Sequence, residues 1–531
     1  MSARVRVVAH VDLDAFYAAC EQQRDRSLLG LPLGVAQYDP FEQGGVSNVP
    51  PDGQRRSTRG NLIAVSYEAR ARGVKRGMNA VEAFALCQEL VVMQVPTAHG
   101  KADLTMYREA GAAVLEVLKR GADTTERASI DEAYFDLTKA AASALRTRSW
   151  SELLEMAGGT NIAGVETLPE SVLPRSAVRN GYVAAESADA GVLSSAWLAR
   201  EEELWSEEER HLVAGAALLS SARAAVRSEL GYSTSAGVAP NKRLAKLCSG
   251  LKKPNAQTLL TSGASPALLR DLPLSRLQGL GGHFGVEVAS KLDITTVGQL
   301  AAVPFARLDA VFKYKDARWL FALAHGILDE PVKDREIPLS ISCSKTFRGS
   351  MALRALPQIQ KYLQDLAAEL HERLADDAAR NSRSPRTLTV SISPSGGAPF
   401  SRSCPWRRAS MADDALGLLK SWAASTPGWE VTGMGLGAHD LEADLAGTRA
   451  MTDFFHVDAQ PEHVEGAATC QRCGKEVGAA DAEEHENFHR LQEMLRMERE
   501  EREKQNGANR QPSASKKPRV QGPLDKLLRR G

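Results

Sequence analysis

The sequence is poor in the features that mark membrane or secreted proteins. No apolar run reaches transmembrane length, and the first residues, "MSARVRVVAHVDLDAFY", lack the apolar core of a signal peptide. Seven cysteines in 531 residues are too few and too scattered for a disulfide framework. The formal net charge is zero, so any affinity for nucleic acid must come from local basic patches. We therefore expect a soluble intracellular protein that does not bind membranes.

Several segments of the chain have a recognisable pattern. The run "VRVVAHVDLDAF" is typical of a strand that ends in two acids, Asp12 and Asp14. A stretch rich in Gly, Pro and Arg at 42–60 predicts an inserted loop. Residues 140–210 carry no clear pattern, and "REEELWSEEER" within them predicts a solvated helical face. The chain beyond about residue 450 is mostly polar, with one structured island near 468–498.

A helix followed by a strand is predicted further along the chain. Residues 359–374 place five apolar side chains on one helical stripe: Ile359, Leu363, Leu366, Leu370 and Leu374. In the following "RTLTVSIS", Leu388, Val390 and Ile392 alternate as in a half-buried strand. A helix packed on a sheet indicates a separate domain in this region.

The stretch "SIDEAYFDL" at 129–137 places Asp131 and Glu132 side by side in a run that suits a strand. Neighbours on a strand point to opposite faces, so one acid would face the core, and burying an unpaired carboxylate is costly. A hairpin bend at 131–132 would instead aim both acids at one point, together with Asp12. Converging carboxylates favour a bound Mg²⁺, and two such ions suit transfer of a nucleotide. The alternative is a set of ordinary acids at strand ends.

Basic residues support a phosphate site. The segment "SYEARARGVKRGM" supplies Tyr67, Arg70 and Arg76, and the basic run at 241–253 supplies Lys246 and Lys253. Arginine forks and lysine ammonium groups are the groups that bind a triphosphate. Each of these residues alone would more often be a surface residue, but together with the acids they indicate a nucleotide site.

A compact zinc site is predicted near the C-terminus. In "CQRCGKEVGAADAEEHENFH" two residues separate Cys470 from Cys473, and three separate His485 from His489. The two histidines are four positions apart and share one face of a predicted helix. This Cys₂His₂ spacing predicts one structural Zn²⁺. The alternative is a pair of free cysteines beside a surface helix.

Four segments resemble, in order, the signature segments of Y-family DNA polymerases, and most of all those of the eta branch: "VDLDAFYAACEQ", "AVSYEARARGV", "ASIDEAY" and "NKRLAKLCSGLKKPN". The resemblance covers about residues 5–440 and implies an α+β, right-hand architecture of palm, fingers, thumb and little finger. The implied domains are palm at 1–20 and 80–240 (with an insertion at about 140–210), fingers at 21–79, thumb at 241–337 with a helix-hairpin-helix in "QGLGGHFG", little finger at 338–445, linker at 446–467, zinc finger at 468–498 and disordered tail at 499–531.

The resemblance also implies roles for individual residues. Two catalytic Mg²⁺ ions would be held by Asp12, Asp131, Glu132 and the backbone carbonyl of Leu13. The incoming triphosphate would be bound by Tyr67, Arg70, Arg76 and Lys253. Tyr17, which follows Phe16, would exclude a ribose 2′-hydroxyl at the position where the eta branch usually has phenylalanine. Gln37 would contact the templating base from the minor groove, and Gly77 would leave room for that base.

The island and the tail resemble partner-binding segments of the eta branch. The island resembles its ubiquitin-binding zinc finger, although Asn487 stands where that family usually has aspartate. "SKKPRV" resembles a nuclear-import patch, which predicts a nuclear protein. "QGPLDKLL" has the spacing of a sliding-clamp-binding box, in which two leucines replace the usual aromatic residues; its residues are Gln521, Leu524, Leu527 and Leu528.

The sequence therefore predicts a template-directed, Mg²⁺-dependent DNA polymerase for translesion synthesis past damaged bases such as cyclobutane pyrimidine dimers. The expected partners are primer–template DNA, deoxynucleoside triphosphates, ubiquitin on a modified sliding clamp, and the clamp itself. The alternatives are a non-catalytic scaffold that binds ubiquitin and the clamp, a nucleotidyl cyclase, and another Y-family branch with a different lesion preference. The acids at 12, 131 and 132 argue against the scaffold, because a scaffold has no use for them.

Overall fold

The computed structural model describes residues 5–37, 60–163, 197–328, 330–347, 349–443, 468–472 and 476–477. The chain divides into two compact units, Met1–Asp444 and Leu445–Gly531. Most of the predicted loop at 42–60 lies outside the described residues, as does part of the insertion at about 140–210. Among the described helices, none is long and apolar enough to cross a membrane.

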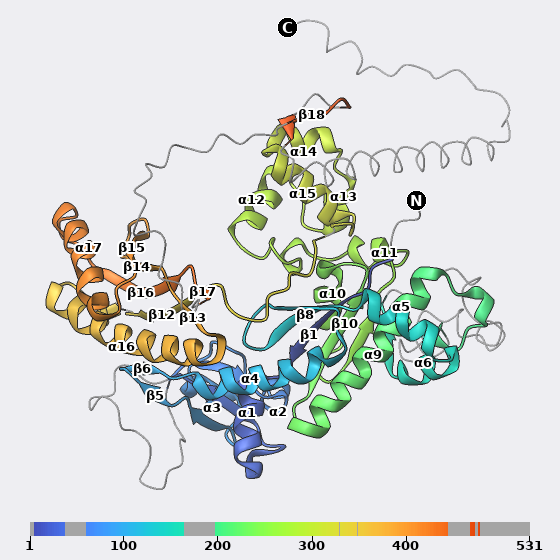
Figure 1. Ribbon diagram of the computed structural model, residues 1–531, viewed down its shortest axis with the longest axis horizontal. Helices are drawn as coiled ribbons and strands as arrows, with labels where there is room; N and C mark the ends of the chain where they lie inside the picture. The colour runs from blue at the N-terminus through green and yellow to red at the C-terminus, as the bar shows by residue number, and fades with distance from the viewer. Residues whose placement is uncertain are drawn as a thin grey trace, which may run out of the picture. The chain divides into compact units, whose positions relative to one another are not determined.

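A six-stranded sheet forms the centre of the first unit (Figure 1). Its strand order is β7-β8-β1-β10-β11-β9. Strands β7, β8, β1 and β10 pair antiparallel with one another, and β11 pairs in parallel with β10 and β9. The strand bounds are β1 Val8–Leu13, β7 Thr124–Arg127, β8 Glu132–Asp136, β9 Thr160–Ile162, β10 Thr234–Ala239 and β11 Gln257–Leu259.

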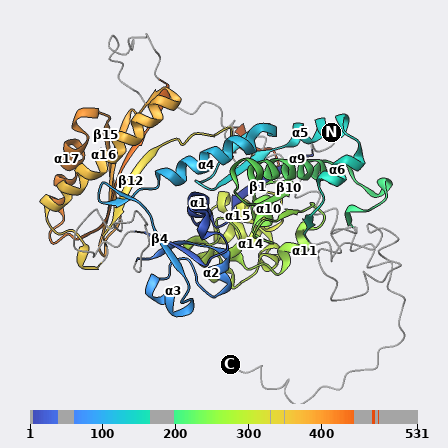
Figure 2. The same cartoon turned by 90° about the horizontal axis from the view of Figure 1, so that it is seen from below.

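Helices cover both faces of this sheet. Gly237 and Val238 are neighbours on β10 and therefore point to opposite faces. A Cβ at Gly237 would meet the carbonyl oxygen of Ala245 on α10 at 2.1 Å, whereas Val238 lies against Gly215 on α9. Helices α4 and α9 pack against each other, as Figure 2 shows. The bounds are α1 Phe16–Arg24, α4 Thr105–Leu118, α5 Thr138–Thr147, α6 Trp150–Met156, α9 Glu207–Leu230 and α10 Lys242–Ser249.

The predicted solvated face around 200–210 is only partly right. Helix α9 begins at Glu207, after the 3₁₀ turn η5 (Glu202–Leu204). Trp205 is buried, and the Arg200 guanidinium lies over two adjoining indoles, 4.1 Å from the centre of the Trp197 ring and 3.9 Å from that of the Trp205 ring. The Glu209 carboxylate lies 3.1 Å from Arg200. Burial of a cation here depends on cation–π contacts that charge patterning along the sequence does not reveal.

Residues 26–102 add a small sheet of order β3-β2-β4 and a two-stranded hairpin. Strand β2 pairs antiparallel with β3 and in parallel with β4. The bounds are η1 Arg26–Leu28, β2 Leu33–Ala36, β3 Leu62–Val65, α2 Tyr67–Ala71, α3 Ala80–Leu86, β4 Val91–Gln94, β5 Thr97–Ala98 and β6 Lys101–Ala102, with η2 (Lys119–Gly121) after α4.

Residues 265–324 are helical. The turn before α12 is close-packed: a Cβ at Gly285 would lie 1.7 Å from the carbonyl oxygen of Leu280, so only glycine fits there. The segment "QGLGGHFG", in which the resemblance implies a helix-hairpin-helix, thus forms a glycine-containing turn between η6 and α12. The bounds are α11 Ser265–Arg270, η6 Leu274–Arg276, α12 His283–Leu292, α13 Val297–Ala302, α14 Phe305–Val311 and α15 Tyr314–Ala324.

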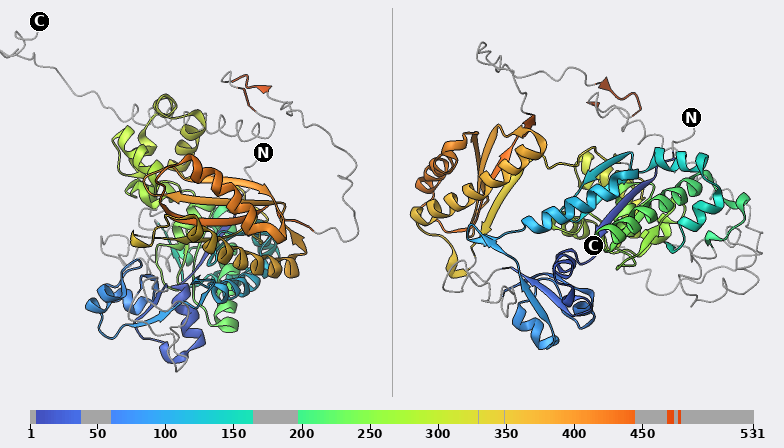
Figure 3. Two further views of the ribbon diagram at one scale, coloured as in Figure 1. Left: turned by 90° about the vertical axis from the view of Figure 1, so that its left-hand side faces the viewer. Right: turned by 60° about the horizontal axis from the view of Figure 1, so that its bottom comes forward.

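The predicted helix on a sheet is present at 341–443. An antiparallel sheet of order β12-β16-β14-β15 is covered on one face by α16 and α17 (Figure 3). The five stripe residues of α16 are buried, as are the three alternating residues of β14. The bounds are β12 Ile341–Thr346, η7 Gly349–Met351, α16 Leu356–Asn381, β13 Arg383–Ser384, β14 Thr387–Pro394, β15 Phe400–Pro405, η8 Arg408–Ser410, α17 Met411–Ser425, β16 Val431–His439 and β17 Glu442–Ala443.

The segment between α15 and β12 runs along β7, an edge strand of the central sheet. Arg335 accepts a hydrogen bond from the Arg127 N–H at 2.8 Å and donates its own N–H to Thr125 at 3.0 Å. The Glu126 carboxylate, buried between them, accepts from the Lys242 ammonium at 2.6 Å and from the Lys333 N–H at 2.9 Å. The connecting segment is therefore fixed to the sheet by both backbone and side chains.

Candidate active site

The structure brings two of the predicted acids together on adjacent strands. Asp12 on β1 lies directly opposite Glu132, the first residue of β8. Cross-strand partners share a face, and their Cβ atoms are about 4.5–5.5 Å apart. Asp131 lies in the turn that precedes β8, so the alternation of the strand does not direct it into the core. The Leu13 N–H donates to the Asp131 carbonyl oxygen at 3.0 Å, which holds the turn against β1.

The bend that the sequence predicts here is fixed locally. The Ser129 hydroxyl donates to the Asp131 carboxylate at 2.6 Å. The same hydroxyl oxygen accepts from the N–H groups of Asp131 at 3.2 Å and of Glu132 at 3.1 Å. The N–H groups of Ala128 and Ser129 both donate to the carbonyl oxygen of Glu132. Asp131 thus has a partner in its own turn.

Two lysines neutralise the cross-strand pair. The Lys253 ammonium contacts the Asp12 carboxylate, and the Lys246 ammonium lies 2.7 Å from Glu132. Burial raises the pKa of Asp12 to about 6; Lys253 opposes this rise, and the neighbouring charge of Glu132 adds to it. Two half-buried carboxylates side by side repel each other, so this position favours cations.

The donor set fits a hard divalent ion. The carboxylates of Asp12 and Glu132 converge on the α10 face of the sheet, and lysine ammonium groups are the cations that pair with them there. Carboxylate and carbonyl oxygens are the ligands that Mg²⁺ prefers. Within the described part of the chain, no three His, Cys, Asp or Glu side chains surround one point. Asp131, turned toward Ser129, is the acid that would have to rotate to join the other two.

His10 is a site residue that sequence reasoning missed. It is fully buried on β1, and its Nδ1 lies 2.7 Å from the Ser249 hydroxyl of α10. Its Nε2 lies 4.0 Å from Glu132 and has no hydrogen-bond partner. Burial, together with Lys246, Lys253 and Lys242, holds the pKa of His10 well below its ordinary value, so the ring is neutral. His10 is two positions before Asp12 on one strand, and residues with this spacing share a face of the sheet, so the sequence could have placed it beside the acids.

Tyr67 and Arg70, both on α2, lie near the acids. The Arg70 guanidinium lies 4.6 Å from the centre of the Tyr67 ring, and its Nε donates to the Val65 carbonyl oxygen at 3.0 Å. Burial, together with the charges of Asp14 and Asp12, raises the pKa of Tyr67 to about 12, and Arg70 opposes this rise. The helix therefore faces the end of β1, as a triphosphate site would require.

Of the two aromatic residues that begin α1, only Tyr17 faces the acids. Phe16 is 3% exposed and packs in the core. Tyr17 is partly exposed and stacks on Tyr107 with ring centres 4.2 Å apart. Burial raises the pKa of Tyr17, the charge of Asp131 raises it further, and Arg76 lowers it. The structure thus brings both Asp131 and Arg76 within electrostatic range of Tyr17.

Gln37 and Gly77 each form a backbone hydrogen bond near the start of β3. The Gln37 N–H donates to the Asn61 carbonyl oxygen at 3.1 Å, and the Gly77 N–H donates to that of Leu62 at 2.8 Å. Gly77 has a φ of +92° and open space where a Cβ would project. Backbone conformation alone therefore explains this glycine. Its predicted role beside the template stays a prediction.

The other predicted ligands lie in the second unit. Cys470 follows β18 (Ala468–Thr469), which pairs antiparallel with β19 (Glu476–Val477). The remaining zinc and clamp residues lie outside the described residues: Cys473, His485, His489, Gln521, Leu524, Leu527 and Leu528.

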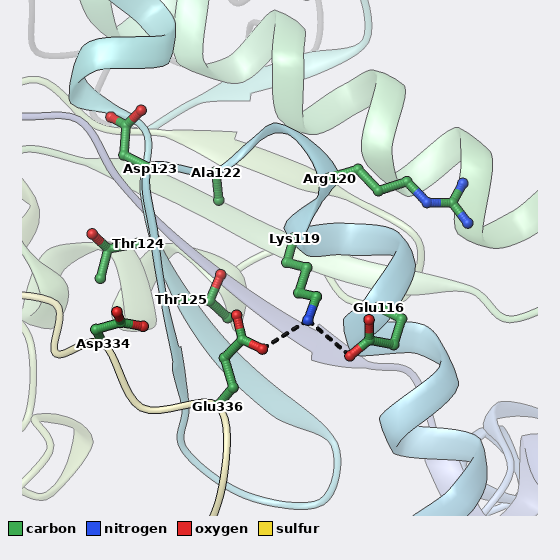
Figure 4. A pocket seen from close by; sticks show the side chains of 9 residues that line it. All are labelled: Glu116, Lys119, Arg120, Ala122, Asp123, Thr124, Thr125, Asp334 and Glu336. Atoms are coloured by element: carbon green, nitrogen blue, oxygen red, sulfur yellow. Dashed lines mark hydrogen bonds and ion pairs between the residues drawn. The ribbon is translucent and has the colours of Figure 1, made fainter. Parts of the chain in front are cut away.

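A hollow of about 620 Å³ lies apart from the acids, between the end of α4, β7 and the segment at 334–336. Figure 4 shows Lys119 at its centre, with its ammonium 2.7 Å from Glu336 and 2.9 Å from Glu116. None of the predicted site residues lines it. The chemistry expected from the sequence therefore lies elsewhere, at the end of β1 and β8.

Comparison with known families identifies the family of this chain. Residues 11–250 match the impB/mucB/samB family and residues 338–451 match its C-terminal domain, so the two models together cover more than half of the chain. Residues 272–327 match the helix-hairpin-helix motif of DNA polymerase eta and Rev1. The chain belongs to the Y family of DNA polymerases.

Relatives of this Y-family chain include polymerases of several kinds. DNA polymerase eta of Arabidopsis thaliana is 34% identical over 472 residues, which are 85% of this chain and 65% of that protein. DNA polymerase eta of Drosophila melanogaster is 34% identical over 388 residues, 72% of this chain and 42% of its own length. DNA polymerase IV of Xanthomonas campestris is 28% identical over 422 residues, 78% of this chain and 89% of its own. The chain thus spans less than two thirds of the two eta polymerases.

Proposed function

We propose that this Y-family chain is a template-directed DNA polymerase that copies past damaged bases, including cyclobutane pyrimidine dimers. The observation that carries the proposal is the pairing of Asp12 with Glu132 across β1 and β8, each acid held by a lysine. Tyr67 and Arg70 lie beside this pair. Acids and phosphate-binding groups at one place are what nucleotidyl transfer needs.

The proposed domains follow the elements of the structure. The palm is the six-stranded sheet with its helices, and the fingers are the small β3-β2-β4 sheet with α2 and α3. The thumb contains α10 to α15, and its α12 turn is close-packed enough for backbone N–H groups to approach a DNA phosphate. The little finger is the four-stranded sheet with α16 and α17.

Asp12, Asp131, Glu132 and the Leu13 carbonyl are the proposed ligands of two Mg²⁺ ions. When bound, such ions activate an attacking hydroxyl and stabilise a leaving pyrophosphate. Lys253 can exchange the Asp12 carboxylate for a phosphate oxygen, because an ammonium group on a flexible stem accepts either. The Arg70 fork, fixed on Val65, would hold a second phosphate. Tyr17 would exclude a ribose 2′-hydroxyl from the space above Asp131.

The proposal extends to lesions through the template side. Gly77 has no side chain, and the space beyond its Cα is open. Gln37, exposed and adjacent to the same strand, could hold a templating base by a hydrogen bond of about 0.5–1.5 kcal/mol. Both features would let two covalently linked thymines enter together. Insertion of adenine opposite both, at rates within about tenfold of undamaged DNA, is the expected behaviour.

The second unit is proposed to bind partners. Cys470 at the end of β18 would be the first ligand of a structural Zn²⁺, with Cys473, His485 and His489. The finger would bind ubiquitin on a modified sliding clamp, and the tail box at 521–528 would bind the clamp. The basic patch "SKKPRV" would direct the protein to the nucleus.

Primer extension tests the proposed function. The full-length protein, with Mg²⁺ and deoxynucleotides, is given an undamaged template and one with a thymine dimer. Asp12→Ala should reduce incorporation at least 100-fold on both templates. Asp136 lies at the far end of β8, so Asp136→Ala is the matched control and should retain nucleotide incorporation. No incorporation by the wild type would refute the polymerase; stalling before the dimer's first base would refute the lesion preference alone.

A further inference from the structure

Asp14 is a buried carboxylate that neither the metal site nor the triphosphate site uses. It lies just past the end of β1 and is 5% exposed. Burying a carboxylate requires partners, and Asp14 has three donors at 2.7 Å each. Two are the hydroxyls of Ser233 and Ser235, next to and on β10, and the third is the backbone N–H of Asn255.

The third donor joins Asp14 to the loop that carries Lys253. Asn255 follows Lys253 by two residues and has a φ of +52°, a left-handed conformation that asparagine adopts more readily than most other residues. Its N–H is held by Asp14, and its side-chain oxygen lies 3.4 Å from the Arg223 guanidinium of α9. The next residue, Ala256, accepts from the Ala236 N–H at 2.9 Å.

We propose that Asp14 is a positioning residue for nucleotide binding: by holding Asn255 it sets where the Lys253 ammonium lies. This inference rests on the proposed function, because it assigns Lys253 to the triphosphate. Asp14 itself touches neither substrate nor metal, since both of its oxygens accept hydrogen bonds from the protein. The two serines anchor the carboxylate to β10, so the loop takes its position from the central sheet.

The bland alternative is that Asp14 only joins β1 to β10 through its serines. A double-mutant cycle separates the two roles. Asp14→Ala and Lys253→Ala should each raise the KM for the incoming nucleotide about tenfold, with kcat falling less than threefold in Asp14→Ala. If Asp14 acts through Lys253, adding Asp14→Ala to Lys253→Ala should change KM less than twofold. A further tenfold rise in the double variant would overturn the proposal.

Two further variants control for folding. Asp14→Asn keeps the shape and one acceptor for the Asn255 N–H, so it should recover most of the lost affinity. Asp136 accepts the Thr138 N–H at 2.9 Å on the same sheet, far from Lys253. Asp136→Ala should therefore leave the KM for nucleotide unchanged. An equal rise of KM in Asp136→Ala would mean that any loss in this sheet has the same effect, and would overturn the proposal.

Hydrogen exchange tests the loop without any reaction. In the full chain without nucleotide, the Asn255 amide should exchange at least tenfold faster in Asp14→Ala than in the wild type. Unchanged exchange would overturn the proposal whatever the kinetics. If the wild type incorporates no nucleotide, the proposed function fails, while the exchange result still decides whether Asp14 holds the loop.

Discussion

Removing the charge of Asp12 should abolish turnover and yet stabilise the metal-free protein. Burial raises the pKa of Asp12 from an ordinary 3.8 to about 6 in the folded chain. Between pH 4 and 6 the folded state therefore holds a proton that the unfolded state has lost, and stability falls as the pH rises through this window. A shift of about two pKa units corresponds to about 3 kcal/mol. The asparagine side chain of the variant Asp12→Asn does not titrate, so the variant does not lose this stability as the pH rises.

The pKa of about 6 already includes the attraction of the Lys253 ammonium, so the net gain of the Asp12→Asn variant should be about 3 kcal/mol above pH 6. Thermal unfolding in a chelator, measured from pH 4 to pH 8, gives the difference directly. The unfolding temperature of Asp12→Asn should exceed that of the wild type above pH 6, and the two should converge near pH 4. Added Mg²⁺ should raise the unfolding temperature of the wild type but not that of Asp12→Asn. A variant that is less stable at pH 7.5, or a difference independent of pH, would refute the reasoning.

Four other changes have definite expected outcomes. Glu132→Ala should lower incorporation to below a few per cent while primer–template binding, measured by anisotropy, persists, because binding rests on phosphate contacts elsewhere; substantial turnover would exclude Glu132 as a ligand. Tyr17→Ala should admit ribonucleotides in single-nucleotide extension, and unchanged discrimination would place the gate elsewhere. Cys470→Ala with Cys473→Ala should lose one zinc per chain by metal analysis without loss of polymerase activity, and absence of zinc from the wild type would contradict the site. Gly77→Ala should cost about 1–2 kcal/mol in stability because of its positive φ, despite the open space, so an unchanged unfolding temperature would contradict this backbone argument.

The part of the site that lies on regular strands was predictable. Alternation and the cost of burying an acid together predicted a bend beside Glu132, and the structure has that bend, fixed by Ser129. The helical stripe from Ile359 to Leu374 is buried, because an apolar stripe is the face with which a helix packs against the core. Local patterns succeed where the decisive contacts lie within one element or one turn.

Contacts between distant segments could not be predicted in the same way. Asp14 was visible as an acid, but nothing in the sequence pairs it with Asn255, 241 positions away. The indoles that contact Arg200 lie in a region without periodicity, where the charged residues indicate a solvated surface. The sequence suggests that Gly77 makes room for the template base, whereas its positive φ alone is enough to require a glycine there. Each case depends on tertiary geometry that composition and spacing do not encode.

The segment that runs along β7 also covers a strand edge that would otherwise be open to pairing with another chain. An edge strand presents unpaired N–H and C=O groups to any other extended chain. Here the backbone of Arg335 forms hydrogen bonds with two of these groups, and Lys119 forms an ion pair with the neighbouring Glu336. The connection between the helical segment and the four-stranded sheet thus leaves fewer free backbone groups on this edge of the central sheet. Proteolytic cleavage near 330–336 would therefore expose the β7 edge and favour aggregation, while the acids on β1 and β8 would keep their positions.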